Sequence, residues 1–269
     1  MPRPTRCLLF LALLASACSA PRIDLAGWRA QEALQRPAAD RGALPAELAR
    51  VDSLRAERRL EEARRLALSL AAEHPQNPAA LSAASRAESD GLVLFANEPK
   101  SVRNAAASSA REYAERAAER GAAAPADRAQ LAWALGAATH LEAMGDRAAH
   151  ARRTLEVAQS ALAAEPEQPV ALATIAIVHL RLETLPWIAN LMATGLPDSS
   201  LEQALDHARR AVAAEPSREH QLILARCLAA ADQRPAAIAT LEQALAQAPA
   251  YPRDTALETT LRAELERLR

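Results

Sequence analysis

The stretch PAAIATLEQALAQAP, residues 235–249, decides the fold of this chain of 269 residues. Small or apolar residues recur in it at offsets 0, 4 and 7 (Ala237, Leu241 and Ala244), and a proline follows at offset 12 (Pro249). These offsets lie on one face of a helix with 3.6 residues per turn. Small residues on that face let a second helix approach closely, and proline cannot continue the hydrogen-bond ladder of a helix. The stretch therefore predicts a helix that packs against a neighbour and ends before Pro249.

The same spacing occurs elsewhere along the chain. Three further copies are complete and one is weaker: Ala63, Ala67, Leu70 and Pro75; Thr154, Ala158, Ala161 and Pro166; Ala204, Ala208, Ala211 and Pro216; and, in the weaker form, Tyr113, Ala117, Arg120 and Pro125. A partner helix is expected before each copy, as at 219–231 before 235–247, with a polar turn at 232–234. A similar break is expected at Gly145-Asp146. The repeat predicts an all-α solenoid of about five antiparallel helix pairs and a final helix.

Composition agrees with this fold class. Half of the residues are apolar, 3% are aromatic and seven are glycine. Sandwiches, barrels and glycine-rich nucleotide folds use strands and turns that need aromatic residues and glycine, so the composition argues against them. With 32 basic and 33 acidic residues, the chain has no long-range field that would attract nucleic acid, and few aromatic side chains that could stack on bases. We therefore expect no nucleic-acid partner.

The N-terminus predicts export. Residues 1–17 contain Arg3 and Arg6, followed by an uncharged apolar run of 11 residues, CLLFLALLASA. This run is too short to span a bilayer, and it is typical of a signal peptide. Small residues precede Cys18, which resembles a bacterial lipobox, although Ala15-Ser16-Ala17 also suits ordinary signal peptidase. We expect lipidation at Cys18 and a periplasm-facing envelope location, with the outer membrane favoured because Ser19 is not aspartate.

Residues 18–44 are rich in Ala, Arg and Pro and are expected to form a tether between the lipid and a repeat domain at 45–269. After removal of Cys7 and lipidation of Cys18, Cys227 is the remaining cysteine, so no internal disulfide is expected. We expect Cys227 to be a small apolar residue within a helix.

The chain resembles tetratricopeptide repeats, because the spacing of 33 residues between Pro216 and Pro249 is close to the roughly 34 of that repeat. It more specifically resembles bacterial relatives of the regulator-of-microtubule-dynamics family. The matching pieces are Trp133-Ala134-Leu135-Gly136, Leu185-Pro186-Trp187, the run from Leu196 to Ala204, and Pro252-Arg253-Asp254. The chain departs from the family at 174–178, where the family carries a Gly-Arg-Trp-like stretch. Repeat lipoproteins of TRAP transporters offer a second, weaker resemblance, carried by the lipobox, the helical array and Pro75-x-Asn77.

No motif for catalysis or metal binding is present in the sequence. The six His residues lack metal-ligand spacing, and nucleophile-elbow, P-loop and Rossmann motifs are missing. Adjacent carboxylates such as Glu61-Glu62 lie among arginines, as on a solvated helix face. We expect no enzyme activity, no cofactor and no metal.

Binding is expected on the concave inner wall of the solenoid, formed by the first helix of each pair. With Leu135-Gly136 as the point of close helix packing, Trp133 and His140 face this wall. Equivalent positions on later helices are assigned to His179 and Arg226, with Glu219 at the lip. Trp133 could instead be a core residue and His179 a satisfied buried histidine. Trp187, in the insertion 185–200 that ends in a capping box Ser199-x-x-Glu202, could dock a partner or cap the solenoid.

These features lead us to expect a non-catalytic lipoprotein scaffold that binds a protein or peptide partner in a concave groove. The alternative is a periplasmic small-ligand carrier that serves a transporter, which predicts a closed apolar cavity around 185–196.

Overall fold

The computed structural model describes residues 44–57, 59–94, 99–143, 145–185, 195–247 and 252–269. Within them the chain forms eleven α-helices and one short 3-10 helix, with no strand. The helices are α2 (Leu44–Ala56), α3 (Leu60–Glu73), α4 (Pro78–Leu94), α5 (Lys100–Glu119), α6 (Pro125–Ala138), η2 (Thr139–Leu141), α7 (Arg147–Ala164), α8 (Pro169–Glu183), α10 (Leu201–Ala214), α11 (Arg218–Ala230), α12 (Arg234–Ala246) and α13 (Pro252–Leu268).

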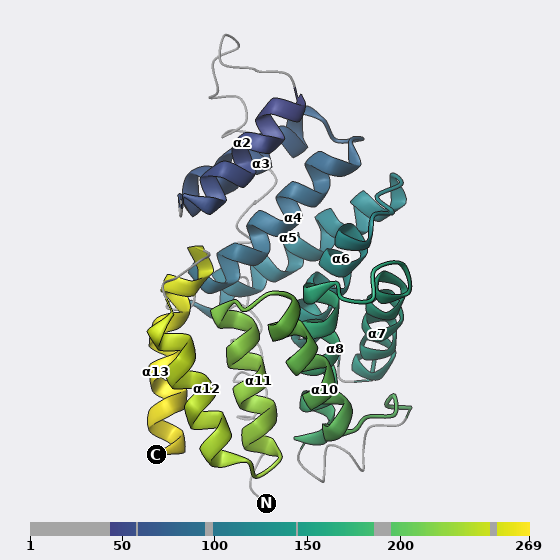
Figure 1. Cartoon of the computed structure of the whole chain (residues 1–269). Coiled ribbons are helices and arrows are strands. Elements are labelled where there is room, and N and C mark those ends of the chain that lie inside the picture. The colour runs from purple at the N-terminus through teal and green to yellow at the C-terminus, as the bar shows by residue number, and fades with distance from the viewer. Residues whose placement is uncertain (1–43, 58, 95–98, 144, 186–194, 248–251) are drawn as a thin grey trace, which may run out of the picture.

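The helices stack as pairs into a curved array, which confirms the predicted all-α solenoid (Figure 1). The pairs are α2 with α3, α4 with α5, α6 with α7, α8 with α10, and α11 with α12, and each pair contacts the next. Helix α13 follows the last pair. The predicted bounds 219–231 and 235–247 differ by one residue from those of α11 and α12.

The repeated small residues form the contacts between helices. In all four complete copies, the residues at offsets 0, 4 and 7 are at most 2% exposed. They lie on the second helix of a pair, namely α3, α7, α10 and α12. Helices α3, α7 and α10 end before Pro75, Pro166 and Pro216 respectively, as predicted, and Pro249 lies outside the described residues.

One local prediction is wrong in detail. Ser200, not Ser199, caps α10, because its side-chain oxygen accepts a hydrogen bond from the backbone N–H of Gln203 at 3.0 Å. At Gly136, within the predicted point of close helix packing, a Cβ would lie 3.6 Å from Thr154 of α7 and 3.9 Å from Thr174 of α8, so both neighbouring helices lie at ordinary contact distance there. The polar turn between α11 and α12 forms as predicted, with Asp232 in the left-handed region at φ 56°.

Helix α13 closes the array on one side. It packs on α12 and α11 through Leu257, Leu261, Leu265 and Leu268, all buried. It also contacts α4, a helix of the second pair, and Figure 1 shows its N-terminal end reaching toward that helix. The last helix thus bridges two first helices that are far apart in the sequence, and it partly covers the concave side. Among the described residues, no helix is long and apolar enough to cross a membrane.

Candidate partner-binding cavity

A cavity of about 470 Å³ lies on the concave side of the last three pairs. Its walls come mainly from α6, α8 and α11, the first helices of these pairs, as the sequence predicts. Leu257 and Thr260 of α13 line it from the opposite side, and Leu185 and Leu196 border it beside the insertion. The volume falls within the roughly 300–1,000 Å³ typical of ligand pockets.

The three helices present the same four register positions to the cavity. Each set follows the spacing i, i+3, i+4 and i+7 of one helix face. The sets are Trp133, Gly136 and Ala137 on α6 with His140 in η2; Thr174, Ile177, Val178 and Arg181 on α8; and Glu219, Leu222, Ile223 and Arg226 on α11. Corresponding residues are 41 and then 45 positions apart along the chain. The cavity is therefore built in layers, each with one residue per repeat.

The layers differ in chemistry. The two middle layers are apolar and pair Gly136 and Ala137 with Ile177, Val178, Leu222 and Ile223. The layer at one end is basic and consists of His140, Arg181 and Arg226. The layer at the other end holds Trp133, Thr174 and Glu219, about two helical turns or roughly 10 Å away. A bound segment would thus meet apolar walls between a basic end and an end that carries one carboxylate.

At the basic end, Arg226 and Arg181 have different partners. Arg226 forms an ion pair with Glu264 of α13, at 2.8 Å. Arg181 donates a long hydrogen bond of 3.5 Å to the carbonyl oxygen of Gly136, and no described carboxylate forms an ion pair with it. Desolvation by the surrounding helices, followed by the positive charge of Arg226, lowers the pKa of Arg181. The cavity therefore holds the guanidinium of Arg181 near that of Arg226, and Arg181 has no carboxylate partner among the described residues.

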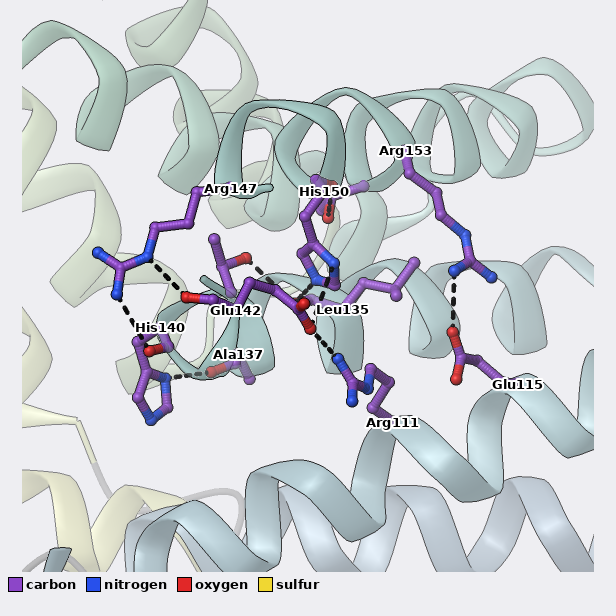
Figure 2. Close-up of polar contacts among 11 residues, drawn as sticks. Arg111, Glu115, Leu135, Ala137, His140, Glu142, Arg147, His150 and Arg153 are labelled. Carbon is purple, nitrogen blue, oxygen red and sulfur yellow. Dashed lines mark hydrogen bonds and ion pairs between the residues drawn. The ribbon is translucent and has the colours of Figure 1, made fainter. Parts of the chain in front are cut away.

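A polar network holds the rim beside this end (Figure 2). The guanidinium of Arg147 donates to the carbonyl oxygens of Glu142 and His140, at 3.2 and 3.3 Å. The Glu142 carboxylate pairs with Arg111 of α5, and His150 of α7 bonds the carbonyl of Leu135 at 2.8 Å. The ring of His140 bonds the carbonyl of Ala137 at 2.9 Å and the side chain of Asn104 at 2.8 Å. These bonds position His140 and Arg147 at the cavity mouth.

The structure places the predicted site residues as follows. Trp133, His140, Glu219 and Arg226 all line this cavity. Trp133 is half-buried and also packs against the core, so it has both of the roles considered for it. Trp187 and Cys18 lie outside the described residues, as do residues 18–43 of the predicted tether, whereas its last residue, Leu44, begins α2.

The predicted orientation of His179 is wrong. Its side chain does not line the cavity; it is 5% exposed and stacks on His207 of α10, with ring centroids 6.3 Å apart. Desolvation, followed by the nearby His207, lowers its pKa. The residue at the corresponding register position is Arg181, which sequence reasoning missed. Arg181 lies 41 residues after His140 and 45 residues before Arg226, the same spacings that separate the other corresponding positions, and these spacings could have identified it.

The described part of the chain offers neither a metal centre nor a reactive thiol. No group of three potential ligands occurs among the described His, Cys, Asp and Glu residues. Cys227 is fully buried in α11, and burial raises its thiol pKa to about 12. It packs as a small apolar residue in the largest core cluster.

A family model described as "Regulator of microtubule dynamics protein 1-3" matches residues 48–269. This match begins within α2 and covers all of the described helices after it. The chain belongs to this family. The regulator-of-microtubule-dynamics match thus confirms the resemblance that the sequence suggested.

Among solved structures, this family member is similar to a thermophilic TPR protein of Thermus thermophilus. The identity is 19%, the TM-score is 0.60, and the alignment covers 84% of this chain and 98% of the other. At this identity the likeness shows the fold, a tetratricopeptide-like helical array. The comparison with curated proteins gave no match.

Proposed function

We propose that this protein is a non-catalytic scaffold, anchored in the bacterial cell envelope through lipidated Cys18 and facing the periplasm, that binds a segment of a protein partner. The observation that carries the proposal is the layered cavity on the inner wall of a tetratricopeptide-like array. Concave walls of stacked helix pairs suit peptide segments and partner helices. The proposed outer-membrane anchor rests on the N-terminal sequence alone.

The position of α13 limits how much of a partner can enter. Because α13 contacts both α11 and α4 and lines the cavity through Leu257 and Thr260, the inner wall is not an open channel along all five pairs. A long extended peptide would have to displace this helix. The scaffold therefore takes a short segment whose apolar side chains fill the cavity between α6, α8 and α11.

Site-specific photo-crosslinking in intact cells tests this proposal. A photoreactive residue replaces Leu182, which lines the cavity, or Glu156, which is exposed on α7 and does not. We expect one dominant protein adduct from position 182 and none of that mass from position 156. The adduct should disappear in Ala137→Phe, which fills the cavity, and persist in Ala149→Phe, an exposed position on α7. An adduct unaffected by Ala137→Phe would place the partner elsewhere.

A second function has one specific observation in its favour. The carrier predicts a closed apolar cavity around 185–196, and the observed cavity borders Leu185 and Leu196 and is lined mainly by apolar side chains, but it opens at the mouth beside His140 and Arg147. Native mass spectrometry of the protein released from membranes distinguishes the two functions. A retained small molecule, lost in Ala137→Phe, together with no protein adduct from position 182, would establish the carrier instead.

The anchor has a separate test. Cys18→Ala should move the protein from the membrane fraction to the soluble periplasmic fraction while leaving the cavity intact. Retention of Cys18→Ala in the membrane fraction would rule out the lipid at this residue as the anchor.

A further inference from the structure

The basic end of the cavity has a consequence for the chemistry of the partner. His140, Arg181 and Arg226 occupy the same register position in three consecutive repeats, at one end of two apolar layers. Arg226 forms an ion pair with Glu264, a carboxylate that it shares with Arg267, and Arg147 at the mouth bonds two backbone carbonyls. Glu219, the one carboxylate in the lining, lies on α11 two turns from Arg226. Neither Arg147 nor Arg181 forms an ion pair with a described carboxylate, but Arg147 is held by its two carbonyl bonds, whereas Arg181 makes one long hydrogen bond to the carbonyl of Gly136.

The helices around Arg181 desolvate its guanidinium only in part, since the residue is exposed and lines the cavity. An apolar segment that entered the cavity would remove the remaining solvent from this guanidinium, and burying a charge without supplying a partner is costly. A segment that carried an anion beside its apolar side chains would replace the lost water with charged hydrogen bonds. The planar guanidinium matches a carboxylate with two parallel hydrogen bonds.

We propose that Arg181 is the anion-recognising residue of the cavity, and that the partner segment carries an aspartate or glutamate side chain next to bulky apolar side chains. This inference rests on the proposed function and specifies the class of partner. The apolar side chains fill the layers formed by Ile177, Val178, Leu222 and Ile223, and the carboxylate reaches the layer of Arg181. The segment is oriented, because its carboxylate pairs with Arg181 at one end of the cavity while its apolar side chains fill the middle layers.

The probe is a random peptide library displayed with both peptide ends joined to the display protein, so that every carboxylate is a side chain. The whole protein, without its lipid, is the bait, and its Ala137→Phe variant is used for counter-selection. We expect the selected peptides to combine Leu, Ile or Phe with Asp or Glu at a constant spacing. Selected peptides with no acidic residue in common would overturn the inference and leave the scaffold function standing.

A double-mutant cycle then assigns the carboxylate to Arg181. The best peptide and its Asp→Asn or Glu→Gln analogue are titrated against the parent protein and against Arg181→Gln. On the parent, loss of the carboxylate should weaken binding roughly ten-fold or more, since a charged hydrogen bond contributes about 1.5–3 kcal/mol. On Arg181→Gln the two peptides should bind alike. If removal of the peptide carboxylate weakened binding to the parent and to Arg181→Gln by the same factor, the inference would be overturned.

Two further variants separate recognition from loss of structure. Arg181→Lys should restore part of the preference for the acidic peptide, because lysine keeps the positive charge but cannot form the two parallel hydrogen bonds of a guanidinium. Arg209→Gln, at an exposed position of α10 outside the cavity, should bind both peptides as the parent does. If the library yields no peptide that binds the parent protein but not Ala137→Phe, that result would count against the scaffold function itself. Saturable binding to phosphatidylglycerol vesicles, abolished in both Ala137→Phe and Arg181→Gln, would replace the acidic segment with a lipid and overturn the inference.

Discussion

The guanidinium of Arg226 on α11 lies 2.8 Å from the carboxylate of Glu264 on α13. The pair joins the inner wall of the solenoid to the helix that covers it, at the basic end of the cavity. Glu264 is also bonded by Arg267 of its own helix at 2.9 Å. Burial raises the pKa of Glu264, but the hydrogen bonds of Arg267 and Arg226 outweigh it, and the pKa is lowered overall.

Arg226→Gln should loosen α13. We expect faster amide hydrogen exchange in α13 and a stability loss of up to about 1 kcal/mol, the usual range for partly exposed pairs. Arg267→Gln is the matched control, because it removes an ion pair to the same carboxylate from within α13. Equal exchange rates in the two variants would show that Arg226 does not tether the helix.

Glu88→Gln should destabilise the N-terminal half. Glu88 is fully buried in α4 and accepts a hydrogen bond from Arg64 of α3 at 3.2 Å. Loss of its charge leaves the buried guanidinium of Arg64 without that carboxylate, at a cost of about 3–5 kcal/mol. The apolar replacement Arg64→Met with Glu88→Leu should recover most of the loss in urea unfolding. If the double variant is no more stable than Glu88→Gln, the cost does not come from the buried charge.

Gly136→Ala should stabilise the protein. The added methyl group meets Thr154 and Thr174 at ordinary contact distances, and Gly136 lies in the last turn of α6. Replacement of a helical glycine by alanine is worth up to about 1 kcal/mol. The urea midpoint should rise without a change in the slope of the unfolding transition. A fall in the midpoint would mean that the inner wall is packed more tightly than the structure shows.

His179 should make the fold sensitive to acid. Its pKa is lowered from the ordinary 6.5 by desolvation first and His207 second, while Glu183 opposes the shift. The unfolded chain therefore binds a proton more readily than the folded protein, and stability is lost as the pH falls below about 6.5. His179→Phe keeps an aromatic ring against His207 and should reduce the fall in melting temperature between about pH 7.5 and 5. The same pH dependence in parent and variant would assign the effect to other groups.

Cys227 should not react while the protein is folded. Its thiol is fully buried and its pKa is raised to about 12 by desolvation, so little thiolate forms at neutral pH. In a variant with Cys7→Ser and Cys18→Ser, a maleimide reagent should label Cys227 in urea and not in buffer. Rapid labelling of the native protein would reveal opening of α11.

The helix pairs could be predicted from the sequence because their signal is local. Offsets 0, 4 and 7 place small residues on one helix face, and Ala158, Ala208 and Leu241 are all fully buried as a result. Proline ends helices for a reason that does not depend on the rest of the fold. The bounds of α11 and α12 were therefore predicted to within one residue.

The cavity was harder to predict, because it depends on which face of each helix turns inward. A shift of one residue rotates a side chain by about 100°, which is enough to exchange Val178, in the lining, for buried His179. Nothing in the local sequence around Arg181 distinguishes it from an ordinary surface arginine, and only its register relative to His140 and Arg226 places it in the lining. The contact of α13 with α4 joins segments more than 150 residues apart, and no periodicity in the sequence encodes it.

The contact between α13 and α4 limits whether this array can gain or lose whole helix pairs. Open repeat arrays can lengthen or shorten by whole units, since each unit touches only its neighbours. Here the last helix must meet α4 at a set distance, so a gained or lost pair would break the contact and uncover the cavity. The number of helix pairs in this protein is therefore coupled to the existence of its cavity.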